Sequence, residues 1–70
     1  MMFTQAERDI VTAPPGMLQV VQVDPTDFGV RREGPPQPSL EAVQEFLGHK
    51  IPAEQEVLWV FNDKGERVLL

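Results

Sequence analysis

The sequence predicts a small α+β domain of order (α)ββαββ, with a mostly antiparallel sheet and one main helix (about 39–48) packed on one face. Two observations lead to this prediction. Apolar residues have helical spacing near the start of the chain and again in 39–50. Segments 17–32 and 56–70 each hold two runs of β-forming residues joined by a turn, which is typical of hairpins. We expect residues 1–70 to form a single domain.

The first segment, residues 1–16, is predicted to be a short helix or an extended arm. Its apolar residues recur at helical spacing, and Thr4 followed by Glu7 fits a capping box. The proline pair that begins at Pro14 would end any helix, because proline lacks the N–H that the helix needs.

A hairpin is predicted over 17–32. Its first strand is rich in valine, and the turn at 24–27 has Pro25 at its second position, where proline is favoured. Alternation then resumes in the second strand. The side chains expected on one face of that strand are Phe28, Val30 and Arg32.

The main helix is predicted over 39–50, after a proline-rich connector at 33–38 that cannot continue a strand. Ser39 is a good N-cap, and Gly48 is placed to end the helix as its C′ residue. A stripe of apolar residues would face the sheet. Its members are Leu40, Val43, Phe46 and Leu47.

The last hairpin, at 56–70, contains an apolar run that presents side chains on both faces of its strand. Trp59 and its alternate neighbours point one way, whereas Leu58 and Val60 point the other. Because the main helix covers only one face, something else must cover the second. Two coverings remain open, namely the N-terminal segment through Phe3, Ala6 and Ile10, or another protein chain.

Composition limits the classes of function. The formal net charge of −5 and the scattered acids argue against a protein that binds the phosphate backbone of nucleic acids. There is no cysteine, so disulfides and thiolate chemistry are excluded. The chain begins without a signal-peptide pattern, and no apolar run is long enough to span a membrane. We therefore expect a cytoplasmic protein without a membrane partner.

No catalytic, cofactor-binding or metal-binding residues are predicted. The single histidine, His49, follows a helix end, where its cationic form favours the helix dipole. Ser39 is explained as a cap. The acid pairs that begin at Asp24 and Asp63 flank turns, where aspartate commonly makes local hydrogen bonds. The chain is therefore expected not to be an enzyme and to need no cofactor.

These patterns favour an intracellular protein–protein interaction module, acting as an accessory or regulatory subunit or as a virus-encoded inhibitor of a larger protein. The partner would be another protein or a second copy of the chain, because the apolar strand has a second face to cover and the last strand is a candidate edge of the sheet. The residues predicted to contact it are Leu58, Trp59, Val60, Leu69 and Leu70. The alternatives are a structural homo-oligomer and a role with nucleic acid. That role would be weak binding through Arg8, Arg31 and Arg32 or mimicry by the acids, although we do not expect nucleic acid as a partner.

Overall fold

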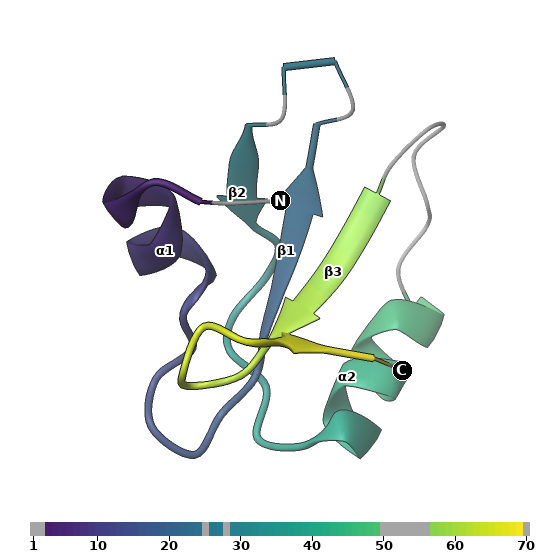
Figure 1. Cartoon of the computed structure of the whole chain (residues 1–70). Coiled ribbons are helices and arrows are strands. Elements are labelled where there is room, and N and C mark those ends of the chain that lie inside the picture. Colours follow the sequence, from purple (N-terminus) through teal and green to yellow (C-terminus); the bar gives the residue numbers. More distant parts are fainter. Residues whose placement is uncertain (1–2, 25, 28, 50–56, 70) are drawn as a thin grey trace.

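The protein is described by a computed structural model that covers residues 3–24, 26–27, 29–49 and 57–69. Its sheet has four antiparallel strands in the order β2-β1-β3-β4 (Figure 1). The elements are α1 (Gln5–Val11), β1 (Gln19–Val23), β2 (Val30–Arg32), α2 (Leu40–His49), β3 (Val57–Phe61) and β4 (Arg67–Val68). The α+β class and the order of elements predicted from the sequence are confirmed.

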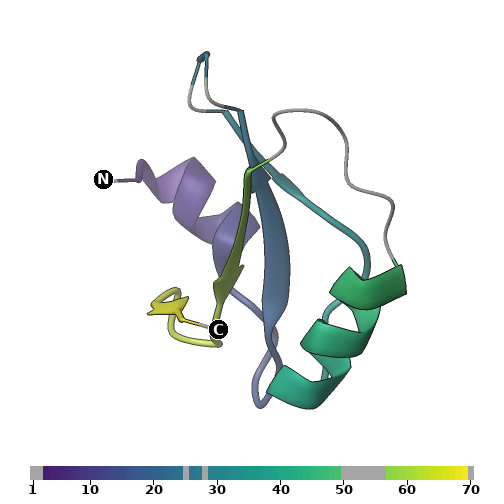
Figure 2. The same cartoon turned by 90° about the vertical axis from the view of Figure 1, so that its right-hand side faces the viewer.

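The two helices lie on opposite faces of the sheet, as the edge-on view in Figure 2 shows. The buried residues on the α1 face are Val11, Val21, Val23, Val30 and Phe61. Those on the α2 face are Val20, Val43 and Val60. The second sheet face is thus covered by the N-terminal helix, which is one of the two coverings that the sequence left open. The cover is incomplete, because Trp59 on that face is only partly buried.

Helix α1 is short, and it is fixed at both ends. At its start the predicted capping box is present: the Glu7 N–H donates to Thr4 Oγ1 at 3.2 Å, and the Thr4 N–H donates to Glu7 Oε1 at 2.9 Å. At its end Arg32 of β2 donates to the carbonyl oxygens of Ile10 and Asp9, at 3.0 and 2.9 Å. These carbonyls have no partner within the helix, so the guanidinium satisfies them and ties the helix to the sheet.

Helix α2 begins as predicted and lies within the predicted range of 39–50, but Gly48 does not have the predicted role. Ser39 Oγ accepts a hydrogen bond from the Ala42 N–H at 3.1 Å, which makes Ser39 the N-cap. The prediction that Gly48 ends the helix is wrong, because α2 continues through Gly48 to His49. Gly48 does not have the positive φ that a C′ glycine requires, whereas Gly16, Gly34 and Gly65 do. Glycine permits a left-handed helix end but does not impose it.

The proline-rich connector makes one contact of strand type with the sheet. Gln37 lies between prolines but keeps its own N–H, which donates to the Leu18 carbonyl at 2.7 Å and is matched by the reverse bond at 2.7 Å. Gln37 of the connector therefore pairs with Leu18 in an isolated antiparallel bridge, although prolines stand on both sides of it. Gly34 has φ 74°, and a Cβ there would lie 2.7 Å from Phe46 Cζ, so this position accepts no side chain without rearrangement.

Both predicted hairpins are present. In the first, β1 pairs with β2, and Phe28 and Pro25 of its turn region lie outside the described residues. In the second, Gly65 has φ 73° and its N–H donates to the Asn62 carbonyl at 3.1 Å, which closes the turn between β3 and β4. No helix within the described ranges is long and apolar enough to cross a membrane.

Candidate functional site

The residues predicted to contact a partner are divided between the two faces of the sheet and its edge. Trp59 lies on the α1 face, and Leu58 and Val60 lie on the α2 face. Val60 is only 3% exposed, because its side chain belongs to the core beneath α2. Leu69 follows β4 and is 78% exposed. Leu70 lies outside the described residues.

A hollow of about 250 Å³ lies at the β3–β4 edge and brings four of these five residues together. Its lining residues are Leu58, Trp59, Val60, Arg67, Val68 and Leu69. The side chains of these residues are apolar except for one cation, and none of them is acidic. The grouping follows from β4, which leaves β3 at a steep angle after a pairing of only two residues (Figure 1). The first residues of β3, before Val60, thus have no described partner strand on the β4 side.

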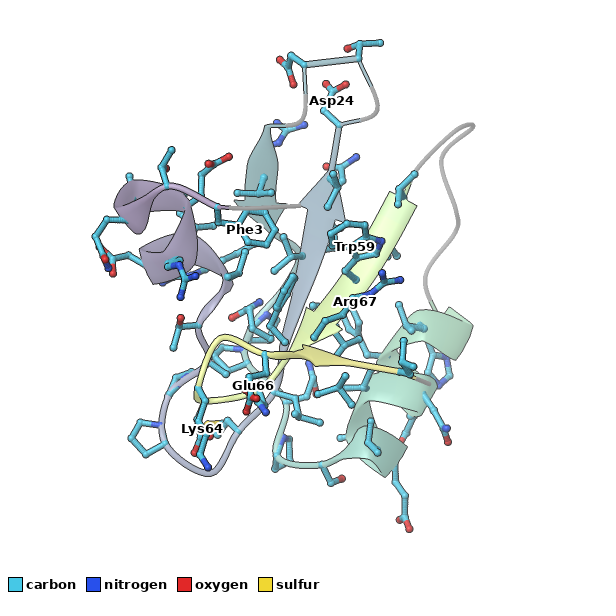
Figure 3. All side chains as sticks on the ribbon, viewed as in Figure 1. Phe3, Asp24, Trp59, Lys64, Glu66 and Arg67 are labelled. Carbon is cyan, nitrogen blue, oxygen red and sulfur yellow. The ribbon has the colours of Figure 1, made fainter. Side chains whose placement is uncertain are left out.

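The Trp59 ring is held by the groups around it. Its centroid lies 6.2 Å from that of Phe61, whose ring in turn meets Phe3 edge to face at 5.6 Å. On its other side the Arg67 guanidinium carbon lies 4.2 Å from the centre of the Trp59 ring, a cation–π distance (Figure 3). Trp59 therefore presents a fixed aromatic surface at the edge, backed by the core.

The backbone of β3 offers hydrogen-bonding groups at the same edge. The Asn62 N–H donates to the Glu66 carbonyl at 2.9 Å across the hairpin. Alternate residues of a strand direct their backbone groups to the same side, so the N–H and C=O of Leu58 also point to the β4 side. The described residues of β4 end at Val68, which is opposite Val60. Leu58 thus lies beyond the last described pair of this ladder.

Arg67 was not predicted as a site residue, although the sequence holds the signal for it. The tight turn after Asn62 sets the register of the hairpin and pairs Phe61 with Arg67. Directly opposed residues share a face, and residues two apart along a strand share it as well. Arg67 therefore stands diagonally across from Trp59. Counting residues outward from the turn gives the register of the hairpin, and this register predicts the contact between Arg67 and Trp59.

The arginines considered for nucleic-acid binding lie apart. Arg32 is bound to the last carbonyls of α1, as described above. Arg31 lies on the opposite face of β2 and donates to Gln22 Oε1 at 3.3 Å. Arg8 is exposed on α1. Strand alternation separates Arg31 from Arg32, as the sequence predicted.

A second, polar hollow of about 340 Å³ lies beside the turn between β1 and β2. Asp24 Oδ1 accepts hydrogen bonds there from the Thr26 hydroxyl at 2.6 Å and from the Thr26 N–H at 2.8 Å. The hydroxyl bond, followed by the backbone bond, holds the pKa of Asp24 below its ordinary value of 3.8. These bonds organise the turn, and they explain Asp24 as a structural residue.

The remaining chemical groups are dispersed. Within the described ranges, no three histidine, aspartate or glutamate side chains come together as potential metal ligands. Ser39 serves as the N-cap of α2, and His49 is exposed in the last turn of the same helix. Asp63 Oδ2 accepts a hydrogen bond from the Gly16 N–H at 2.9 Å, which joins two loops.

Comparisons of the chain with models of known protein families, with curated proteins and with solved structures found no match.

Proposed function

We propose that the chain is an intracellular protein-interaction module that acts by binding a larger protein, as an accessory or regulatory subunit, through the β3–β4 edge. The observation that carries this proposal is the hollow where Leu58, Trp59 and Leu69 meet, beside the part of β3 that lies beyond its last described pair with β4. Open edges accept an added strand through their backbone groups, and apolar pockets beside them select its side chains.

The exposure of Leu69 supports this surface. Only two large apolar side chains in the described part of the chain are exposed, Leu69 at 78% and Leu40 at 41%. Leu69 borders the hollow, next to a tryptophan, and tryptophan is enriched among the residues that dominate binding energy. Leu40 begins α2 and lies outside the hollow, so it provides a matched control.

The test is affinity purification of a partner with the tagged chain from the cells in which it occurs, repeated with Leu69→Glu, Trp59→Ala and the control Leu40→Glu. We expect Leu69→Glu and Trp59→Ala to weaken binding of the same partner by about tenfold or more, since interface anchors contribute about 2 kcal/mol. Leu40→Glu should have no such effect. Because Leu69 is outside the core, its substitution should change the free energy of unfolding by less than about 0.5 kcal/mol.

Equal loss of binding and of folding stability in Leu69→Glu would contradict the proposal, as would a partner that tolerates all three substitutions. Concentration-dependent mass of the isolated chain, abolished by Leu69→Glu, would instead assign the edge to self-association. Native mass spectrometry of the unaltered chain and of the Leu69→Glu variant distinguishes self-association from binding of another protein.

A further inference from the structure

Arg67 differs from the other two strand arginines in that its charge is not used within the described structure. Arg32 donates to two helix carbonyls and Arg31 to a glutamine. The Arg67 guanidinium contacts the Trp59 ring, and no carboxylate of the described residues lies within salt-bridge distance of it. No acceptor for its N–H donors is found among the described residues.

The position of Arg67 is suited to binding a carboxylate. A guanidinium that stacks on an aromatic ring keeps its plane parallel to that ring and directs its N–H groups outward, where they match the two oxygens of a carboxylate. Because contact with the ring already restricts the Arg67 side chain, less conformational entropy is lost when a ligand binds it. Arg67 is also the one charged residue among the described residues that line the hollow.

A second copy of the chain does not fit this edge well. Two copies related by a two-fold axis would pair the same residues with each other. A two-fold axis close to Arg67 would bring the two Arg67 side chains together, and the residues that line the second copy's hollow include no carboxylate to pair with either of them. Like charges at directly opposed positions destabilise a strand pair. The charge at the edge instead favours an acidic partner.

We propose that the β3–β4 edge binds an extended acidic segment of another protein, in which a carboxylate pairs with Arg67 while an apolar side chain enters the hollow. Arg67 and Trp59 lie on the α1 face, whereas Leu58 and Val68 lie on the α2 face. Successive residues of an added strand point to alternate faces. The segment should therefore alternate between acidic and apolar residues. This inference rests on the proposed function and adds the chemistry of the partner to it.

The test is selection of binding peptides from a displayed library of random dodecapeptides, with the whole chain as bait. We expect the enriched peptides to alternate Asp or Glu with apolar residues. Selection against Arg67→Glu should enrich Lys or Arg at the same positions. Arg31→Glu serves as the matched control, because it changes the same charge at the opposite edge of the sheet, and its peptides should resemble those of the unaltered chain.

Affinity is then measured with one enriched peptide that lacks tryptophan. Trp59 is the only tryptophan of the chain and lies in the hollow, so its fluorescence reports binding directly. Arg67→Glu should raise Kd by more than about tenfold, and Arg67→Lys should raise it less, because lysine keeps the charge but not the paired donors. Circular dichroism confirms that each variant is folded, and Arg67→Gln replaces any that is not.

The outcomes separate this inference from the proposed function. Peptides without a carboxylate that still lose affinity in Leu69→Glu would overturn the role of Arg67 and leave the edge as the binding surface. An unchanged Kd in the folded Arg67→Glu or Arg67→Gln protein would do the same. Failure to enrich any peptide would overturn both the acidic segment and the edge as a site for extended ligands.

Discussion

The two edges of the sheet each carry an arginine, and the two side chains have different roles. At the β2 edge Arg32 lies within reach of the last turn of α1, and its donors are taken up by the helix carbonyls. At the opposite edge, the Arg67 guanidinium lies over the Trp59 ring, and among the described residues it has no carbonyl partner. The same residue type thus ties a helix to the sheet at one edge and contacts an aromatic ring at the other. What differs is the set of acceptors that the fold places nearby.

The largest expected effect that tests this comparison is on folding stability. Arg32→Ala should lower the free energy of unfolding by about 1.5 kcal/mol, because two charge-assisted hydrogen bonds at the end of α1 are lost. Arg67→Ala should lower it by about 0.5 kcal/mol, the contribution of an exposed cation–π contact. Urea denaturation followed by circular dichroism measures both. Equal losses would show that the two arginines are structurally equivalent.

A somewhat smaller effect is expected at the other end of the helix that Arg32 holds. Thr4→Ala removes the capping side chain of α1 and should cost about 1 kcal/mol. Because Thr4 and Arg32 support a single helix of seven residues, the double variant should lose less stability than the sum of the single losses.

Ser39→Ala, which removes the N-cap of α2, is the control for that pair. Since Ser39 belongs to the helix on the opposite face, its loss should add to that of Arg32→Ala. Denaturation of the three single and two double variants tests this. If the losses in free energy of unfolding for Thr4→Ala and Arg32→Ala were additive, the cap of α1 and the Arg32 contact would act independently.

The smallest effect concerns the turn that begins the β2 edge. The folded pKa of Asp24 lies below its ordinary value, so this carboxylate contributes stability above pH 3.8 that is lost as the pH falls through the folded pKa. Thr26→Val removes the hydroxyl that is the main cause and should move the pKa of Asp24 back toward 3.8. Carboxyl ¹³C NMR titration detects the change. An unaltered titration would assign the low pKa to the backbone hydrogen bonds and the charge of Arg31.

Local patterns in the sequence predicted most of the fold. The capping residues Thr4 and Ser39, the turn glycine Gly65 and the alternation around Trp59 each act over a few residues, and the structure contains all of them. Gly48 was the exception, because a glycine near a helix end is compatible with two backbone conformations.

The site was predicted less completely, since it depends on contacts between distant segments. The sequence grouped Val60 with Leu58 on the surface, but α2 packs over that face and buries Val60. The roles of Arg32 and Arg67 depend on strand register and on which helix end lies beside which edge. A residue's own neighbours in the sequence do not contain that information.

The order of strands in the sheet has a consequence for the synthesis of the chain. The central strand β1 is made early, but its partner β3 is made about forty residues later, after α2. Until β3 emerges from the ribosome, β1 has only β2 beside it, and Val20 and Val21 lack the neighbour that completes their burial. The strand that closes the core is also the strand that carries Trp59. A nascent or truncated chain that lacks it has neither a finished core nor the proposed binding edge, so the edge forms together with the core.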